Sequence, residues 1–205
     1  MAMKVHHLCR SQSARVVWLC EALGIPYNLH PYDSISPRAI SQPPLAGTAR
    51  IITDSPVVLA ETGAIFEYIL TKYGNGKLSC ANGSLQPGLI NLMFSRMNTE
   101  ANPAEDIGAQ VSQKRVDVNF KEMDTRLAES PYLAGEEFTA ADCMTVFSLT
   151  TLRTFAPFGL EFYPHIVKYL ERISQRAGYQ SLMAKAEPGM EPAILATAPQ
   201  GILAC

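Results

Sequence analysis

The stretch Met3–Leu23, MKVHHLCRSQSARVVWLCEAL, predicts how the N-terminal part of the chain folds. It has the pattern of a short strand over Lys4–Leu8, a polar turn over Cys9–Ser13 and an amphipathic helix over about Ala14–Leu23. The helix is predicted because apolar residues recur on one face at helical spacing: Val16, Leu19, Cys20 and Leu23. The polar turn therefore leads from a strand directly into a helix.

Two serines of this turn, Ser11 and Ser13, are candidates to cap the helix, because a short hydroxyl accepts a hydrogen bond from an unpaired amide of the first turn. The helix end also offers N–H groups and a partial positive charge. A strand that delivers a hydroxyl there is suited to holding an anion, although many such units serve only as well-capped structure. The turn is thus a candidate anion site.

Composition limits the classes of function. With 205 residues, the chain suffices for one large domain or two small ones, and its 47% of apolar residues predicts a packed core. A net charge of −2 gives no basic field for nucleic acid or an anionic membrane. No apolar run approaches the roughly 18 residues that span a bilayer, and the start, MAMKVHHL, reads as a strand rather than a signal peptide. We expect neither nucleic acid nor a membrane as a partner.

The cysteines and histidines indicate a reducing, cytoplasmic setting and no metal site. The cysteines are odd in number and scattered, with neither metal-ligand spacing nor a disulfide framework. They are Cys9, Cys20, Cys80, Cys143 and Cys205. Of the histidines, His6 and His7 lie in the first strand, where we expect one of them to face the core.

The residues up to 76 predict a small α/β domain. Tyr27–Tyr32 reads as a second strand, and the β-rich runs Ile51–Thr53 and Val57–Leu59 form a hairpin. Thr62 is predicted to cap a helix that ends near Tyr73. A parallel strand pair followed by a hairpin makes a mixed sheet with helices packed on it.

The rest of the chain reads as helical. Apolar stripes at helical spacing comprise Leu89, Leu92, Met93 and Met97, and then Val116, Phe120, Met123 and Leu127. Thr139 is predicted to cap a further helix together with Asp142 as a capping box, and Pro164 to open a last long helix. We expect an α/β domain over 1–76, a linker over 77–87, an all-helical substrate domain over 88–187 and an irregular surface tail over 188–205.

The order of these elements and four motifs resemble the glutathione S-transferase superfamily from Met3 to about Lys185. The motifs are SQSARVVWL (Ser11–Leu19), ETGAIFEYI (Glu61–Ile69), YLAGEEFTAAD (Tyr132–Asp142) and the final helix from Tyr163 to Arg176. The first resembles the catalytic-serine segment of theta-like, bacterial and fungal members, in which a serine lies four residues before an arginine. The resemblance implies a thioredoxin-like α/β domain followed by an all-α domain, with glutathione as the cofactor.

The resemblance makes Ser11 the expected catalytic residue, as the hydrogen-bond donor to the glutathione sulfur. A cysteine thiol has a reference pKa of about 8.5, and lowering it by about two units needs roughly 2.7 kcal/mol of selective stabilisation of the anion. A helix N-terminus supplies about 0.3–1 kcal/mol, or up to about 2 kcal/mol when partly buried. A hydroxyl donating to a charged acceptor adds about 1.5–3 kcal/mol, so that no general base is required.

Glu61 and Thr62 are expected to bind the γ-glutamyl end of glutathione. Thr62 and the first amides of its helix would hold the α-carboxylate, and Glu61 the α-ammonium. The alternative is a capping threonine beside a solvated glutamate. For the glycyl carboxylate the sequence offers Arg38, Gln42 and Arg50 without ranking them.

The chain departs from the family pattern before the third strand. The family usually has a cis-proline there, and the backbone of the residue before it binds the cysteinyl unit. Here the run is GTAR (Gly47–Arg50), so that Arg50 stands where the proline is expected. A cis bond before a non-proline residue costs roughly 2.5–4 kcal/mol, so we expect an altered loop, with the backbone contact of Ala49 in doubt. Arg50 either reaches the glycyl carboxylate or the substrate, or is a solvated arginine.

A second departure lies at 98–107, where Pro103 interrupts any helix. Family members often carry longer helices here that wall the second-substrate site, so shorter ones would leave it more open.

Cys9 is a separate candidate for redox or thiol-transferase chemistry, because a thiol near a helix start can be acidic. No second cysteine accompanies it in Cys9–Gln12.

Three functions stay open on these residues. The first is conjugation of glutathione to an electrophilic, hydrophobic small molecule. The second is reversible addition to a conjugated alkene, which isomerises it and regenerates glutathione; small fungal enzymes of secondary metabolism, which the chain resembles in style, include both activities. The third is a non-catalytic binding or scaffold protein. By resemblance we also expect a homodimer; the second substrate is not identified, because apolar pockets follow shape rather than motif.

Overall fold

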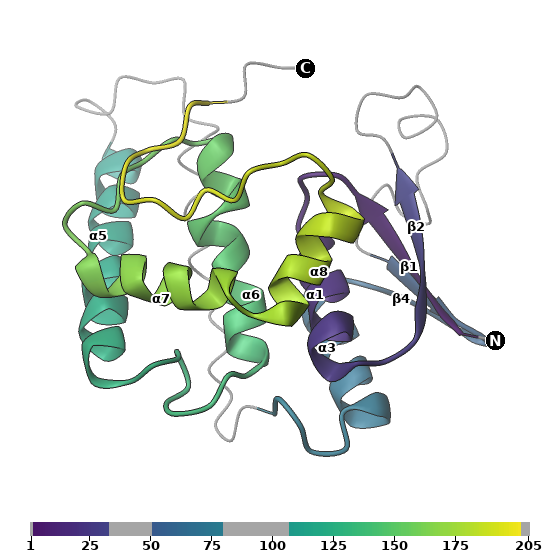
Figure 1. The fold of residues 1–205 in the computed structure, drawn as a ribbon. Coiled ribbons are helices and arrows are strands. Elements are labelled where there is room, and N and C mark those ends of the chain that lie inside the picture. The colour runs from purple at the N-terminus through teal and green to yellow at the C-terminus, as the bar shows by residue number, and fades with distance from the viewer. Residues whose placement is uncertain (1, 33–50, 80–106, 202–205) are drawn as a thin grey trace. The chain divides into compact units, whose positions relative to one another are not determined.

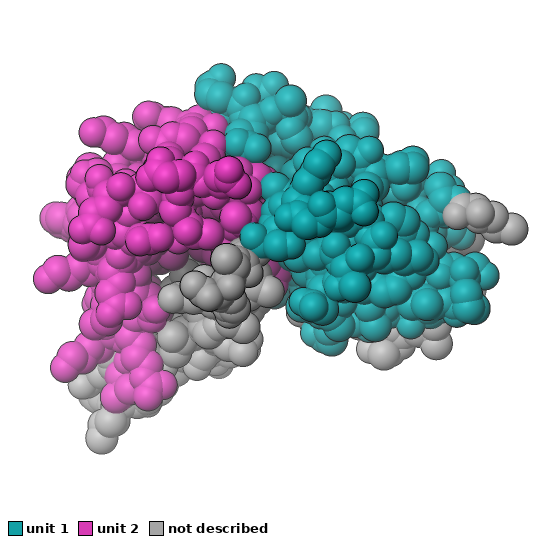
Figure 2. Space-filling model, turned by 90° about the horizontal axis from the view of Figure 1, so that it is seen from below, with its two compact units in different colours: residues 1–81, 173–192, 204–205 teal, residues 82–172, 193–203 magenta. Residues whose placement is uncertain are grey.

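The structure of the chain, a computed structural model, describes residues 2–32, 51–79 and 107–201. The chain divides into two compact units. Unit 1 comprises Met1–Ala81, Ile173–Pro192 and Ala204–Cys205, and unit 2 comprises Asn82–Arg172 and Ala193–Leu203 (Figure 2). The N-terminal residues therefore share a unit with a segment that comes after most of the helical part of the chain.

In the described residues, unit 1 contains a four-stranded mixed sheet in the order β2-β1-β3-β4. The strands are β1 (Met3–Leu8), β2 (Tyr27–Tyr32), β3 (Ile51–Asp54) and β4 (Val57–Ala60) (Figure 1). β1 pairs in parallel with β2 and antiparallel with β3, and β3 pairs antiparallel with β4. The parallel pair and the hairpin that the sequence predicts are both confirmed.

Helices pack against this sheet to complete the core of unit 1. They are α1 (Ala14–Leu23), α3 (Thr62–Tyr73) and α8 (Ala177–Ala186). α1 and α3 contact the strands, and α8 packs along α1 (Figure 1). The buried ring of Trp18 meets that of Tyr179 edge to face at 5.2 Å, which joins α1 to α8. α1 ends at Gly24, whose φ of 68° suits a residue without a Cβ.

A buried carboxylate at the end of β3 anchors α3. Asp54 Oδ2 accepts hydrogen bonds from Tyr68 OH (2.7 Å), Lys72 Nζ (2.8 Å) and Tyr73 OH (2.6 Å). The hydrogen bonds from Lys72 and Tyr73 lower the pKa of Asp54 to about 2. The ionised carboxylate therefore ties the hairpin to the C-terminal half of α3.

The helices of unit 2 follow their predicted patterns. They are α5 (Ile107–Glu129), α6 (Ala140–Leu149) and most of α7 (Pro164–Ser174), with a 3-10 turn, η2, at Thr151–Thr154. The predicted stripe of α5 is buried: Val116, Phe120, Met123 and Leu127. The capping box of α6 is confirmed, since Thr139 N donates to Asp142 Oδ2 (2.8 Å) and Ala141 N donates to Thr139 Oγ1 (3.3 Å). Within the described ranges, no helix is both long and apolar enough to cross a membrane.

Two helix boundaries differ from the expectation. Thr62 does not cap α3 but is its first residue, and Glu61 occupies the N-cap position without a side-chain capping bond. The helix that Pro164 opens is not the last one, because it ends at Ser174 and α8 follows. The short link between α7 and α8 contains neither proline nor glycine, so the sequence pattern runs on through it.

The residues after 188 form no helix or strand as far as 201, and a buried arginine holds them. Arg153 of η2 is fully buried. Its Nε donates to Phe158 O at 3.0 Å. Its Nη atoms donate to the carbonyl oxygens of Ala193, Leu195, Ala196 and Thr197 at 2.8–3.3 Å. The tail up to 201 thus lies at the surface, where the Arg153 guanidinium and a hydrogen bond from Leu160 N to Ala196 O (2.7 Å) hold it.

Candidate functional site

The topology of unit 1 brings the expected site residues to one edge of the sheet. β1 and β4 run in the same direction, because each is antiparallel to β3 between them. Ser11 follows the carboxyl end of β1, and Glu61 and Thr62 follow that of β4. Adjacent strands lie about 4.8 Å apart, so β1 and β4 are separated by roughly 10 Å. The two segments therefore share an edge at a separation that a short peptide spans.

The side chain of Ser11 is turned toward Ser13. The two hydroxyl oxygens lie 2.6 Å apart, and Ser13 N donates to Ser11 Oγ at 3.2 Å. Arg10, just before Ser11, has a φ of 58°, which a non-glycine residue adopts only at some cost. The turn after β1 is thus fixed by its own side chains as well as by its backbone.

Ser13 does not cap α1 in the expected way. It lies at the N-cap position with helical backbone angles and makes no side-chain capping bond. The amides of Ala14 and Arg15 already donate to the carbonyls of Ser11 and Gln12, at 3.1 and 3.2 Å. These two amides are therefore not available to a ligand, and the hydroxyl of Ser11 is the candidate group of the turn.

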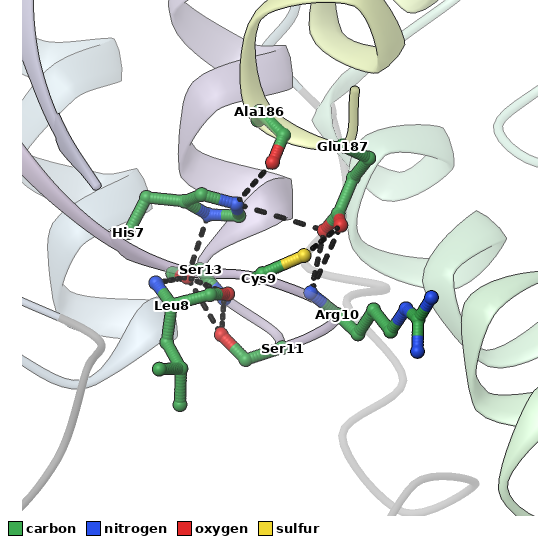
Figure 3. A network of polar contacts seen from close by, with 8 residues as sticks. All are labelled: His7, Leu8, Cys9, Arg10, Ser11, Ser13, Ala186 and Glu187. Atoms are coloured by element: carbon green, nitrogen blue, oxygen red, sulfur yellow. Dashed lines mark hydrogen bonds and ion pairs between the residues drawn. The ribbon is translucent and has the colours of Figure 1, made fainter. Parts of the chain in front are cut away.

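A buried polar network extends inward from these serines (Figure 3). Ser13 Oγ lies 2.9 Å from His7 Nδ1, and His7 Nε2 lies 2.9 Å from Ala186 O at the end of α8. Glu187 Oε1 is 3.6 Å from the same Nε2. His7, Ser13 and Glu187 are each at most 1% exposed. Burial lowers the pKa of His7, so the neutral imidazole is favoured. His7 is the histidine of the first strand that faces the core, as expected.

Glu187 holds the turn after β1 from the other side. Both of its carboxylate oxygens accept the Arg10 N–H at 2.9 Å, and Oε2 also accepts the Cys9 thiol at 3.1 Å (Figure 3). Burial raises the pKa of Glu187, whereas the Cys9 and Arg10 donors act in the opposite direction. Glu187 therefore engages both the Cys9 thiol and the Arg10 amide of this turn.

The N-terminus of α3 presents, at the same sheet edge, amide donors that its own helix leaves unpaired. Its first intrahelical bond runs from Ile65 N to Glu61 O (2.9 Å), so the three preceding amides have no partner within the helix. Thr62 is 4% exposed, and its hydroxyl has no hydrogen-bond partner among the described residues. A Cβ built on Gly63 would meet nothing within 4 Å, so the space beside these amides is open.

Glu61 is held in a strained conformation, with φ of 74° and ψ of 126°. A non-glycine residue in such a region costs about 1–3 kcal/mol, and positions of this kind cluster at binding sites. The conformation ends β4 abruptly and starts α3 at the next residue. Glu61 is exposed at this point.

Other expected residues lie outside the described part of the chain. They are Arg38, Gln42, Ala49, Arg50, the stripe Leu89–Met97 and the interruption at Pro103. Within the described ranges, no group of three or more His, Cys, Asp or Glu side chains is placed to hold a metal ion.

The site residues that the sequence did not indicate are Ser13 as a partner of His7, and Glu187. The contact between His7 and Ser13 could have been predicted, because a core-facing residue at the end of a strand lies close to the start of the helix that follows the turn. Glu187 carries no such signal, because it lies 177 residues beyond Arg10, in a region predicted as the end of the helical domain.

Comparison with known proteins gives a consistent result. Residues 89–177 match the family model of the glutathione S-transferase C-terminal domain. The chain is similar to glutathione S-transferase 3 of Schizosaccharomyces pombe, with 26% identity over 89% of this chain and 87% of the relative. It is also similar to glutathione S-transferase 1 of Saccharomyces cerevisiae, with 26% identity over 90% of this chain and 95% of the relative. Among solved structures, a glutathione S-transferase of Actinobacillus pleuropneumoniae is 25% identical with a TM-score of 0.77, covering 92% of this chain and 94% of its own.

Proposed function

We propose that the chain, as a member of the glutathione S-transferase superfamily, binds glutathione at the edge formed by the ends of β1 and β4 and activates the thiol for attack on an electrophilic small molecule. The main support is the pairing of two polar sites at the separation that glutathione needs. A fully extended tripeptide reaches about 10 Å, so a molecule of this size can contact both segments across the roughly 10 Å between β1 and β4.

The N-terminus of α3 is the proposed γ-glutamyl site. Its unpaired amides, the buried Thr62 hydroxyl and the helix dipole suit a carboxylate, and the exposed Glu61 suits the neighbouring ammonium. The open space beside Gly63 admits the ligand. Ala49 and Arg50 stay proposed contacts to the cysteinyl and glycyl parts.

Ser11 is the proposed donor to the glutathione sulfur. Its hydroxyl lies at the start of α1, so the sulfur would meet both the hydrogen bond and the positive end of the helix dipole. The thiolate then attacks an electrophilic carbon, forming a carbon–sulfur bond.

Calorimetric titration with glutathione tests the binding site. We expect the wild type to bind, Glu61→Gln to weaken binding about tenfold or more, and Glu67→Gln, an exposed glutamate of the same helix, to leave it unchanged. Ser11→Ala is expected to keep most of the affinity but to lower turnover of a model electrophile about 10- to 150-fold, the equivalent of about 1.5–3 kcal/mol. Absence of binding in the wild type would instead support a scaffold protein.

We propose conjugation as the reaction and isomerisation of a conjugated alkene as the alternative, since both begin with attack by the same thiolate. With limiting glutathione and a conjugated alkene, a conjugating enzyme stops when the thiol is consumed, whereas an isomerase continues.

We further propose a cytoplasmic homodimer, which sedimentation tests: a single species of 22.4 kDa at micromolar concentration would contradict it.

A further inference from the structure

We propose that the proton of the glutathione thiol passes through the hydroxyls of Ser11 and Ser13 to Nδ1 of His7, which acts as the proton acceptor of the site. The proposal rests on the proposed function and deepens it, because it states where the proton goes when the thiolate forms. The three groups form a continuous chain, with 2.6 Å between the two hydroxyl oxygens and 2.9 Å from Ser13 Oγ to His7 Nδ1 (Figure 3).

The partners of His7 fix the direction of these hydrogen bonds. Ala186 O is only an acceptor, so His7 Nε2 carries the hydrogen that bonds to it at 2.9 Å. In the neutral imidazole the other nitrogen is then an acceptor. Ser13 therefore donates to His7 Nδ1, which at 2.9 Å is a shorter contact than the 3.3 Å to the carbonyl of Leu8.

The orientation of Ser13 sets that of Ser11. With its one hydrogen directed at His7, Ser13 Oγ is left to accept, and it accepts from Leu8 N (3.1 Å) and from the Ser11 hydroxyl (2.6 Å). Ser11 Oγ in turn accepts from Ser13 N at 3.2 Å and keeps one lone pair. Without ligand, Ser11 thus offers an acceptor to an incoming thiol, not a donor.

Transfer along this chain creates the thiolate and its hydrogen-bond donor in one shift. The S–H bond breaks with its electron pair left on sulfur, and its proton joins Ser11 Oγ. The former Ser11 proton moves to Ser13 Oγ, and the former Ser13 proton moves to His7 Nδ1. After the shift, the hydroxyl hydrogen of Ser13 points to Ser11 Oγ, and that of Ser11 points to the sulfur. Ser11 therefore now donates to the thiolate. After addition to an alkene, the same route in reverse returns a proton to the carbanion of the product.

The surroundings of His7 suit the imidazolium that this shift forms. The Nε2–H remains bonded to Ala186 O, and the carboxylate of Glu187 lies 3.6 Å from Nε2. The oxygens of Glu187 accept hydrogen bonds from the Arg10 amide and the Cys9 thiol. Removing both charges from water is costly, and their attraction offsets this cost only where hydrogen bonds satisfy the remaining polar atoms, as the Ala186 carbonyl, the Arg10 amide and the Cys9 thiol do here. The sequence alone required no base for thiolate formation, but the structure supplies one.

A count of protons tests the proposal. Binding of glutathione near neutral pH is measured by calorimetry in buffers of different ionisation enthalpy, which gives the protons released, and by ultraviolet difference absorbance, which gives the thiolate formed. We expect the wild type to form thiolate with almost no proton release, because His7 keeps the proton. We expect His7→Gln to release one proton for every thiolate it forms. Ser13→Ala, which leaves His7 in place, should give the same change even if His7→Gln does not fold.

His6→Gln is the matched control, since its side chain lies on the opposite face of the same strand and bonds to Tyr32 and Thr53; the wild-type ratio is expected. Release of one proton per thiolate by the wild type overturns the relay while leaving glutathione binding intact. A wild-type ratio in both His7→Gln and Ser13→Ala also overturns it. A wild type that does not bind glutathione refutes the proposed function itself, and the two failures are thereby distinguished.

Discussion

Replacing Asp54 by asparagine tests the ionic anchor between β3 and α3. Asp54 is 6% exposed and accepts hydrogen bonds from Tyr68, Lys72 and Tyr73. The pKa of its carboxyl falls from 3.8 to about 2. At about 1.4 kcal/mol per unit, the shift corresponds to roughly 2 kcal/mol of stability, an upper value because Lys72 is 45% exposed and partly screened by solvent.

The sign of the pH dependence follows from the lowered pKa. A carboxyl whose pKa is lower in the folded state contributes fully above its unfolded value, and the contribution is lost as pH falls from about 4 through about 2. We expect Asp54→Asn to lower the free energy of unfolding by about 2 kcal/mol at neutral pH, and by much less near pH 2. Trp18, the one tryptophan of the chain and a residue of the same unit, reports urea unfolding by its fluorescence.

Glu67→Gln on the exposed face of α3 is the control for Asp54→Asn, and its effect is expected to stay within about 0.5 kcal/mol. An equal cost of Asp54→Asn at neutral and acid pH would refute the reasoning, because the loss would then not depend on the charge. A neutral-pH cost no larger than that of the control would show that the cluster adds nothing to stability.

Two further substitutions test other parts of the molecule. Arg153→Lys keeps the charge but cannot direct hydrogen bonds to five carbonyls, so we expect a loss of about 2–3 kcal/mol in urea unfolding and faster proteolysis between 188 and 201. Unchanged proteolysis would show that other contacts hold the tail. Thr62→Val removes a buried hydroxyl without a partner in the described residues, so stability should be unchanged or slightly higher while glutathione affinity falls about 5- to 10-fold. Equal affinity in calorimetry would remove Thr62 from the binding site.

Much of unit 1 was predictable because its signals are local. The strand, turn and helix within Met3–Leu23 follow from alternation, turn chemistry and helical spacing, and the helix has the bounds that were expected. The capping box of Thr139 and Asp142 was predictable for the same reason, since its two residues lie three apart and bond to each other's backbone. In both cases the pattern and the contact involve the same few residues.

The structure departs from the predicted helix caps where a side chain bonds to a residue outside its own turn, or where the backbone conformation shifts the helix start. Ser13 fits the pattern of a capping residue, but its hydroxyl bonds to His7, which lies on β1 just before the turn. Thr62 was expected to cap α3, but the strained backbone of Glu61 starts the helix one residue earlier. Glu187 and Arg153 were missed because their acceptors and donors lie far away in the chain or are backbone groups, which no residue pattern encodes.

The contact of Glu187 with the turn after β1 has a consequence for biosynthesis. Chains emerge from the ribosome N-terminus first, and domains generally fold as units. Here the segment that packs along α1 and buttresses Arg10 is made only after most of the polypeptide has been translated. The turn after β1 therefore lacks the support of Glu187 until α8 and the residue that follows it have been translated.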